Sequence, residues 1–186
     1  MEKERLRKAK ENWDVLNRII NYISLIVILI IVVYSLSMLI TQYLSSGAIT
    51  VGQWLVELEW PLPYFAKPIS YLSVALVVFW FSYLELKKDY YLQLDPIKRR
   101  ICFLLALIFA FVSLYETFYN FMVWNALITS DAIRGFIIID AQNLPYPNPK
   151  IPWNLPFATK LFSSIAAMSL YSLYFFHKHE KKRAVD

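Results

Sequence analysis

The chain has few of the residues that build catalytic and metal-binding sites. Its 186 residues include one cysteine, Cys102, and two histidines, His177 and His179. A single cysteine excludes an internal disulfide and any metal site with several cysteine ligands. The two histidines are two positions apart in a basic run, which places them on different faces of a helix, so the sequence predicts no metal site. Neither lies in the middle of an apolar run, so the chain alone cannot supply paired axial histidines to a membrane haem.

Glycine is also scarce, at three residues, and the motifs that depend on it are missing. The sequence contains no G-x-G-x-x-G, no Walker-type loop, no H-E-x-x-H and no G-x-S-x-G. With no catalytic motif, the sequence gives no indication of an enzyme or of a cofactor. The net charge of +5 would suit a nucleic acid, but the basic residues lie at the ends of apolar runs, as they do in membrane proteins. We therefore predict no nucleic-acid partner.

Apolar sequence is what the chain has in quantity. Hydrophobic residues make up 58% of it, compared with about 45–50% in ordinary soluble domains. The apolar residues form four runs that can serve as membrane-spanning helices. With their margins, these runs cover residues 19–44, 68–86, 101–128 and 156–177. They predict an all-α membrane protein whose fold is a bundle of four transmembrane helices.

The positive residues predict the orientation of this bundle. Residues 1–18, 85–100 and 178–186 together hold 15 of the 19 Lys and Arg residues. Because Lys and Arg concentrate on the cytoplasmic side, we expect a multi-pass protein of the cell membrane with both termini in the cytoplasm. Residues 1–18 have apolar positions at helical spacing and predict an amphipathic helix, the alternative being a frayed, solvated terminus. Residues 178–186 predict a basic cytoplasmic tail.

Two connections, at residues 46–66 and 130–155, are expected on the outer side. Both are rich in aromatic side chains, and the second contains several prolines, which resist helix formation. Their aromatic content predicts ordered extracytoplasmic loops that lie in the membrane interface or contact a partner. The candidate interface residues are Trp54, Trp60, Phe136 and Trp153.

One carboxylate lies close to the middle of the third run. Glu116 is the only formal charge in residues 101–128. A carboxylate at bilayer depth costs roughly 2.5–3.5 kcal/mol on insertion scales, so it rarely faces lipid. Side chains three and four positions apart form a polar stripe with it. The candidate binding stripe is Ser113, Glu116, Thr117, Asn120 and Trp124.

Two interpretations of this stripe remain open. Glu116 can carry a proton or bind a cation, or it can form a hydrogen bond with a quinone or a lipid headgroup. It can instead tie the third span to neighbouring helices through hydroxyl and amide side chains. The first run also has a polar face that predicts contact with other helices, formed by Asn17, Asn21, Ser24, Ser35 and Gln42.

The absence of catalytic motifs favours a non-catalytic accessory or structural subunit of a larger membrane complex. Its partners would be the lipid bilayer and either other membrane subunits or further copies of the chain. Two alternatives remain: a small transporter or channel component that uses Glu116, and a membrane enzyme subunit that binds a lipid or a quinone.

Overall fold

The computed structural model describes residues 2–47, 49–59, 67–135 and 153–183, with the backbone alone described at 2–10 and 181–183. Apart from short connections and one isolated bridge between Val51 and Trp153, these residues are helical. The predicted all-α fold is confirmed for this part of the chain. The helices are α1 (Glu2–Ser46), α2 (Gln53–Glu57), α3 (Pro68–Leu86), α4 (Lys88–Gln93), α5 (Pro96–Ile133) and α6 (Leu155–Arg183).

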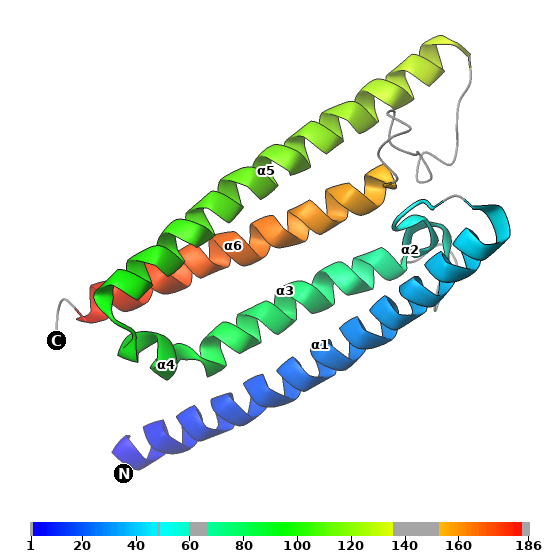
Figure 1. Cartoon of the computed structure of the whole chain (residues 1–186). Coiled ribbons are helices and arrows are strands. Elements are labelled where there is room, and N and C mark those ends of the chain that lie inside the picture. Colours follow the sequence, from blue (N-terminus) through cyan, green and yellow to red (C-terminus); the bar gives the residue numbers. More distant parts are fainter. Residues whose placement is uncertain (1, 48, 60–66, 136–152, 184–186) are drawn as a thin grey trace.

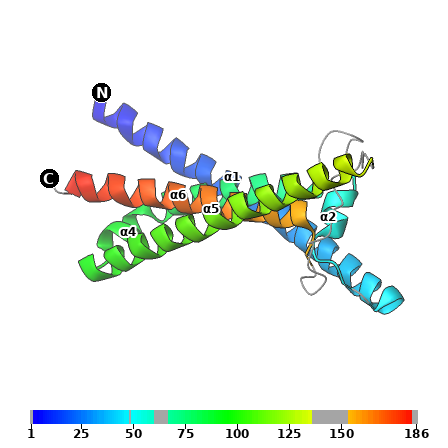
Figure 2. The same ribbon diagram turned by 90° about the horizontal axis from the view of Figure 1, so that it is seen from above.

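The four long helices lie side by side in a row (Figure 1). The order across the row is α1, α3, α6 and α5, because α1 packs on α3, α3 on α6, and α6 on α5. Seen from above, α1 crosses the other long helices at an angle (Figure 2). α1 begins and α6 ends at the end of the helices where α4 lies, and α2 lies at the opposite end (Figure 1). The four long helices, which we predicted to form a bundle, therefore lie in an open row (Figure 1).

Three of the helices are long and apolar enough to cross a membrane: α3, α5 and the part of α1 from Glu11 to Ser46. α3 has 19 residues and a length of about 28 Å at 1.5 Å per residue. That length matches a hydrocarbon core of about 30 Å. α1 and α5 are longer, with 45 and 38 residues. These apolar helices are compatible with a membrane protein.

α6 covers the fourth predicted run but is less apolar, and it is not among those three helices. It lies in the middle of the row, with α3 on one side and α5 on the other. Three of its serines, Ser164, Ser169 and Ser172, are buried there. The hydroxyls of Ser164 and Ser172 donate to backbone carbonyls of α6 itself, each at 2.8 Å. Small residues of this kind let neighbouring helices approach closely.

Polar side chains join α1 to α3. Asn21 Nδ2 donates to the carbonyl oxygen of Phe79 at 3.1 Å and to Ser82 Oγ at 3.0 Å. Asn17 and Ser24, about one turn away on either side, are buried as well. The prediction that the polar face of the first run contacts another helix is therefore confirmed.

Three further hydrogen bonds between described side chains join α3 to α6. They run from Trp80 Nε1 to Ser172 Oγ (2.8 Å), from Tyr171 Oη to Glu85 Oε1 (2.9 Å) and from Lys160 Nζ to Ser70 Oγ (2.9 Å). The ring of Phe81 also stacks on that of Tyr171, with centroids 3.9 Å apart. These contacts are spread along the helices, so they fix the rotation of α6 against α3.

Two hydrophobic clusters of described residues lie at opposite ends of the helices. The cluster at the α2 end consists of Leu55, Val56, Ile69, Leu72 and Phe157. The cluster at the α4 end consists of Leu84, Tyr91, Ala106, Phe175 and Phe176. The start of α6 is fixed in the first of these regions, because Asn154 Oδ1 accepts from the Phe157 amide at 3.0 Å and caps the helix. The backbone N–H of Asn154 donates to the backbone carbonyl of Val51 at 3.0 Å.

The predicted boundaries agree with the helices to different degrees. The second run, predicted at 68–86, coincides with α3. The predicted segment 1–18 and the first run form one continuous helix, α1. α5 extends beyond the predicted run at both ends, and α6 continues into the predicted tail. Residues 60–66 and 136–152, which make up much of the two predicted outer loops, lie outside the described residues.

Candidate functional site

The predicted polar stripe lies on the face of α5 that packs on α6. Ser113 and Asn120 are each 1% exposed, while Glu116, Thr117 and Trp124 are half-buried. The fold therefore keeps the five residues on one protein-facing side of the helix. Their role as a binding site stays a prediction.

The hydroxyl groups of the stripe bond to the backbone of α5 itself. Ser113 Oγ donates to the carbonyl oxygen of Phe109 at 2.5 Å, and Thr117 Oγ1 donates to that of Ser113 at 2.7 Å. Bonds of this type, to the carbonyl four residues earlier, are common for Ser and Thr inside helices. Ser113 therefore contributes to the α5–α6 contact by its small size, which permits close approach.

Glu116 lies beside this buried face, in the middle of α5. The large side chains on the other side of the helix are exposed, among them Phe111, Phe118 and Met122. Glu116 itself is half-buried, so its carboxylate is turned away from the most exposed face. This placement agrees with the high cost of a carboxylate in contact with lipid.

The structure describes two of the four aromatic residues that we expected to make outer contacts. Trp54, in α2, and Trp153, just before α6, are 37% and 36% exposed. The ring of Trp153 lies 5.9 Å from that of Phe157, measured between centroids, so part of it is covered within the chain. Trp60 and Phe136 lie outside the described residues.

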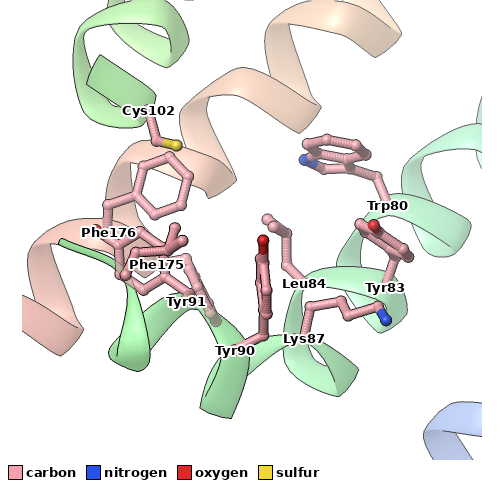
Figure 3. Close-up of a pocket in the computed structure, with 10 residues that line it drawn as sticks. Trp80, Tyr83, Leu84, Lys87, Tyr90, Tyr91, Cys102, Phe175 and Phe176 are labelled. Carbon is pink, nitrogen blue, oxygen red and sulfur yellow. The ribbon is translucent and has the colours of Figure 1, made fainter. Parts of the chain in front are cut away.

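A groove that the sequence analysis missed lies at the α4 end of the helices (Figure 3). It consists of two adjoining cavities of about 450 and 330 Å³, which share Trp80, Cys102 and Phe176. We call the two together the α4 groove. α3 and α5 form its walls, α6 forms its floor, and α4 closes one end.

The two parts of the α4 groove differ in chemistry. The larger cavity, near α4, is lined by aromatic residues with polar tips and by one cation: Tyr83, Tyr90, Tyr91 and Lys87. In Figure 3 the Cys102 sulfur and the Tyr90 hydroxyl point into the space between the helices. The smaller cavity runs along α5 and α6, and its lining is mostly apolar: Leu105, Ala106, Phe109 and Met168. Both cavities are therefore mostly apolar, and the tyrosine hydroxyls and the one lining cation of the groove lie at the α4 end.

Tyr91 carries a buried hydroxyl without a partner. The side chain lines the larger cavity and is 6% exposed, and its ring stacks on Phe176 with centroids 4.7 Å apart. Among the described residues, the hydroxyl has no hydrogen-bond partner. Burial and the nearby Glu180 carboxylate raise the pKa of Tyr91 to about 12. The hydroxyl therefore keeps its proton at neutral pH and is able to donate.

Arg99, at the start of α5, is a second buried group of this kind. It is 7% exposed, and its Nε has no hydrogen-bond partner in the described part of the chain. Its positive charge acts to lower the pKa of Tyr91, so the guanidinium lies near that hydroxyl. A buried polar group that stays unpaired costs about 1–3 kcal/mol. Tyr91 lines the larger cavity, whereas Arg99 lines neither cavity of the groove.

The sequence contains one signal for this groove. Residues 83–100 combine tyrosines with Lys and Arg at the end of an apolar run, a pattern typical of the headgroup region of a membrane. The apolar lining comes from α5 and α6, which are distant in sequence from α3. Only the fold brings these segments together.

The histidines differ in their surroundings, as their spacing suggested. His177 is exposed, whereas His179 is buried with its ring 4.5 Å from that of Phe175, measured between centroids. Across the described ranges, no group of three or more His, Cys, Asp or Glu side chains is arranged to hold a metal ion.

Comparisons with protein-family models, with curated proteins and with solved structures found no match. The class of the protein therefore rests on its own helices. The described part of the chain is helical apart from short connections, and three of its helices are long and apolar enough to cross a membrane. Its function has to be inferred from the surfaces and cavities of those helices.

Proposed function

We propose that this chain is a four-span protein of the cell membrane and a non-catalytic subunit of a larger membrane complex. The observation that carries the proposal is a pair of tyrosines on the open side of α5. Tyr115 is 66% exposed and Tyr119 is 46% exposed, and their rings stack with centroids 6.2 Å apart. Tyr115 lies in the middle of an apolar helix, where lipid tails offer its hydroxyl no partner. A polar side chain on a partner helix would satisfy it.

The open row of helices supports the same proposal. α1 and α5 lie at its two ends, and most of their large apolar side chains are exposed. Lipid can cover much of this surface. A row of this shape also leaves long helix faces on which the helices of other subunits can pack.

Four spans and a cytoplasmic location of both termini fit the remaining observations. α6 is long enough to cross a bilayer, with 29 residues, and its lower apolar content is offset by burial between α3 and α5. The start of α1, the connection around α4 and the end of α6 lie at one end of the helices (Figure 1). These are the segments in which Lys and Arg concentrate, as expected for the cytoplasmic side.

Native purification followed by mass spectrometry of co-purifying chains tests the subunit role. We expect a stable complex with other membrane chains. The double variant Tyr115→Phe, Tyr119→Phe keeps both rings and removes both hydroxyls, and should weaken the complex by about threefold per lost hydrogen bond. Tyr22→Phe is the matched control, because Tyr22 is equally exposed but lies near the start of the first run, where water reaches it. Recovery of the chain alone, or equal effects of both variants, would contradict the proposal.

A transporter or channel component is the second candidate function, favoured by the half-buried position of Glu116 in the middle of α5. In that case Glu116→Gln should abolish proton-linked or cation-linked flux into vesicles, because glutamine cannot titrate. If the chain is instead a subunit without transport activity, Glu116→Gln should assemble and unfold like the parent chain. If Glu116→Leu changes neither flux, assembly nor thermal stability, Glu116 has neither role.

A further inference from the structure

We propose that the α4 groove binds one anionic phospholipid from the leaflet at the α4 end of the helices. One acyl chain lies along α5 and α6 in the apolar cavity, and the phosphate lies beside Lys87 and Tyr91. The proposal requires only that the long helices cross a bilayer, and it holds for either orientation.

The shape of the groove fits an acyl chain. Its two cavities of about 450 and 330 Å³ adjoin end to end around Trp80, Cys102 and Phe176, and both fall in the range of small-molecule sites, about 300–1,000 Å³. A helix of another protein, about 10 Å across, is too wide for a space of this size. The lining along α5 and α6 is apolar, as a hydrocarbon chain requires.

The wall of the groove at Trp80 is fixed. Its indole Nε1 donates to Ser172 Oγ at 2.8 Å, and its ring stacks on Tyr83 with centroids 5.9 Å apart. With its N–H satisfied on the α6 side, the ring presents an apolar surface to the cavity. The groove therefore does not depend on a mobile side chain to remain open.

The charged side chain that lines the groove at the α4 end, Lys87, is a cation and favours an anionic headgroup. Lys87 lines the larger cavity and is exposed, and the buried hydroxyl of Tyr91 has no hydrogen-bond partner among the described residues. Arg99 lies near that hydroxyl but lines neither cavity. Two acidic side chains also lie near this end of the groove. Glu180 lies close enough to Tyr91 to raise the pKa of its hydroxyl, and Glu85 accepts a hydrogen bond from Tyr171. Basic pockets between membrane helices are typical sites for anionic headgroups.

Cys102 provides a direct probe of occupancy, because it is the only cysteine of the chain and it lines both cavities. The full chain is reconstituted in vesicles of phosphatidylcholine alone or of an equimolar mixture with phosphatidylglycerol. The rate of Cys102 alkylation by N-ethylmaleimide is then measured. A bound acyl chain covers the thiol, so alkylation should be several-fold slower in the mixed vesicles. Equal rates in the two vesicles would overturn the proposal.

Three variants separate a specific site from a general effect of surface charge. Lys87→Gln should weaken the lipid-dependent protection by about fivefold, since one lysine near an anionic surface contributes about that much. Tyr91→Phe leaves the charge unchanged and removes one hydrogen bond, and it should also weaken protection by about fivefold. Lys88→Gln is the matched control, because Lys88 does not line either cavity. If Lys88→Gln reduces protection as much as Lys87→Gln, surface charge explains the effect and the site is refuted.

Folding of each variant is checked by its alkylation rate in phosphatidylcholine alone, which should equal that of the parent chain. The test is independent of the proposed subunit role. If phosphatidylglycerol gave no protection, the lipid site would be refuted and the proposed partner interface on α5 would be unaffected. A chain that purifies alone but keeps this protection would refute the subunit role and keep the lipid site.

Discussion

The contact between Gly52 and Phe157 shows how one residue fixes the α2 end of the molecule. Gly52 has a φ of +83°, which L-residues rarely adopt, and a Cβ atom at this position would overlap the ring of Phe157. Gly52→Ala should therefore lower the free energy of unfolding by about 2–4 kcal/mol, from the combined cost of backbone strain and overpacking. Thermal or denaturant unfolding in detergent measures this change.

Gly47 is the natural control for that substitution. It also has a positive φ, +66°, but nothing lies near the position of its Cβ. Gly47→Ala should cost only the backbone term, about 1–2 kcal/mol. Equal effects of the two variants would mean that the contact between Gly52 and Phe157 contributes nothing to stability.

Single residues were predictable from the sequence only where helical spacing alone determines the answer. The burial of Ser113 and Asn120 follows from their positions on one face of a helix. The burial of Tyr91 does not, because it depends on the way that α4 packs on Phe175 and Phe176 of α6. Sequence patterns contain no information about such a contact between distant segments.

Asn21 joins α1 to α3, the helix on which α1 mainly packs. Its two hydrogen bonds to Phe79 and Ser82 cross from α1 to α3. Asn21→Leu should lower stability by about 0.6 kcal/mol, the average measured for hydrogen bonds between membrane helices, and by at most about 1.7 kcal/mol. Unfolding in a denaturing detergent, followed by circular dichroism, measures the loss.

The control for Asn21 lies on the same helix. Asn12 is exposed, so Asn12→Leu should leave stability unchanged. If Asn21→Leu proved neutral as well, the α1–α3 contact would depend on apolar packing alone.

Helix positions were more predictable than helix packing. The apolar run predicted at residues 68–86 coincides with α3. α5 and α6 continue past the predicted membrane spans, because charged residues can extend a helix beyond its apolar run. The row was not predictable, since an apolar helix face looks the same whether it meets lipid or another helix. The α4 groove depends on this arrangement, so it was missed as well.

At the scale of the whole molecule, the proposed topology makes one further prediction. In a Cys102→Ser background, single cysteines at Gln93, Ser45 and Ala132 report which side of the membrane each position reaches. All three positions are exposed. Gln93 lies at the end of α4, Ser45 near the end of α1 and Ala132 near the end of α5. We expect an impermeant maleimide added to intact cells to label Ser45→Cys and Ala132→Cys, and to label Gln93→Cys only after the membrane is opened.

The reason for this expectation is the distribution of charge along the helices. Segments at the α4 end hold 15 of the 19 Lys and Arg residues, and such a bias sets the orientation of a membrane protein. Ser45 and Ala132 both lie at the α2 end of their helices (Figure 1), so they must share a side whichever way the protein is inserted. Labelling of Gln93→Cys together with Ser45→Cys on intact cells would refute the proposed crossing by α3. Labelling of Gln93→Cys alone would keep the spans and reverse the orientation, which would show that the positive charges do not govern insertion of this protein.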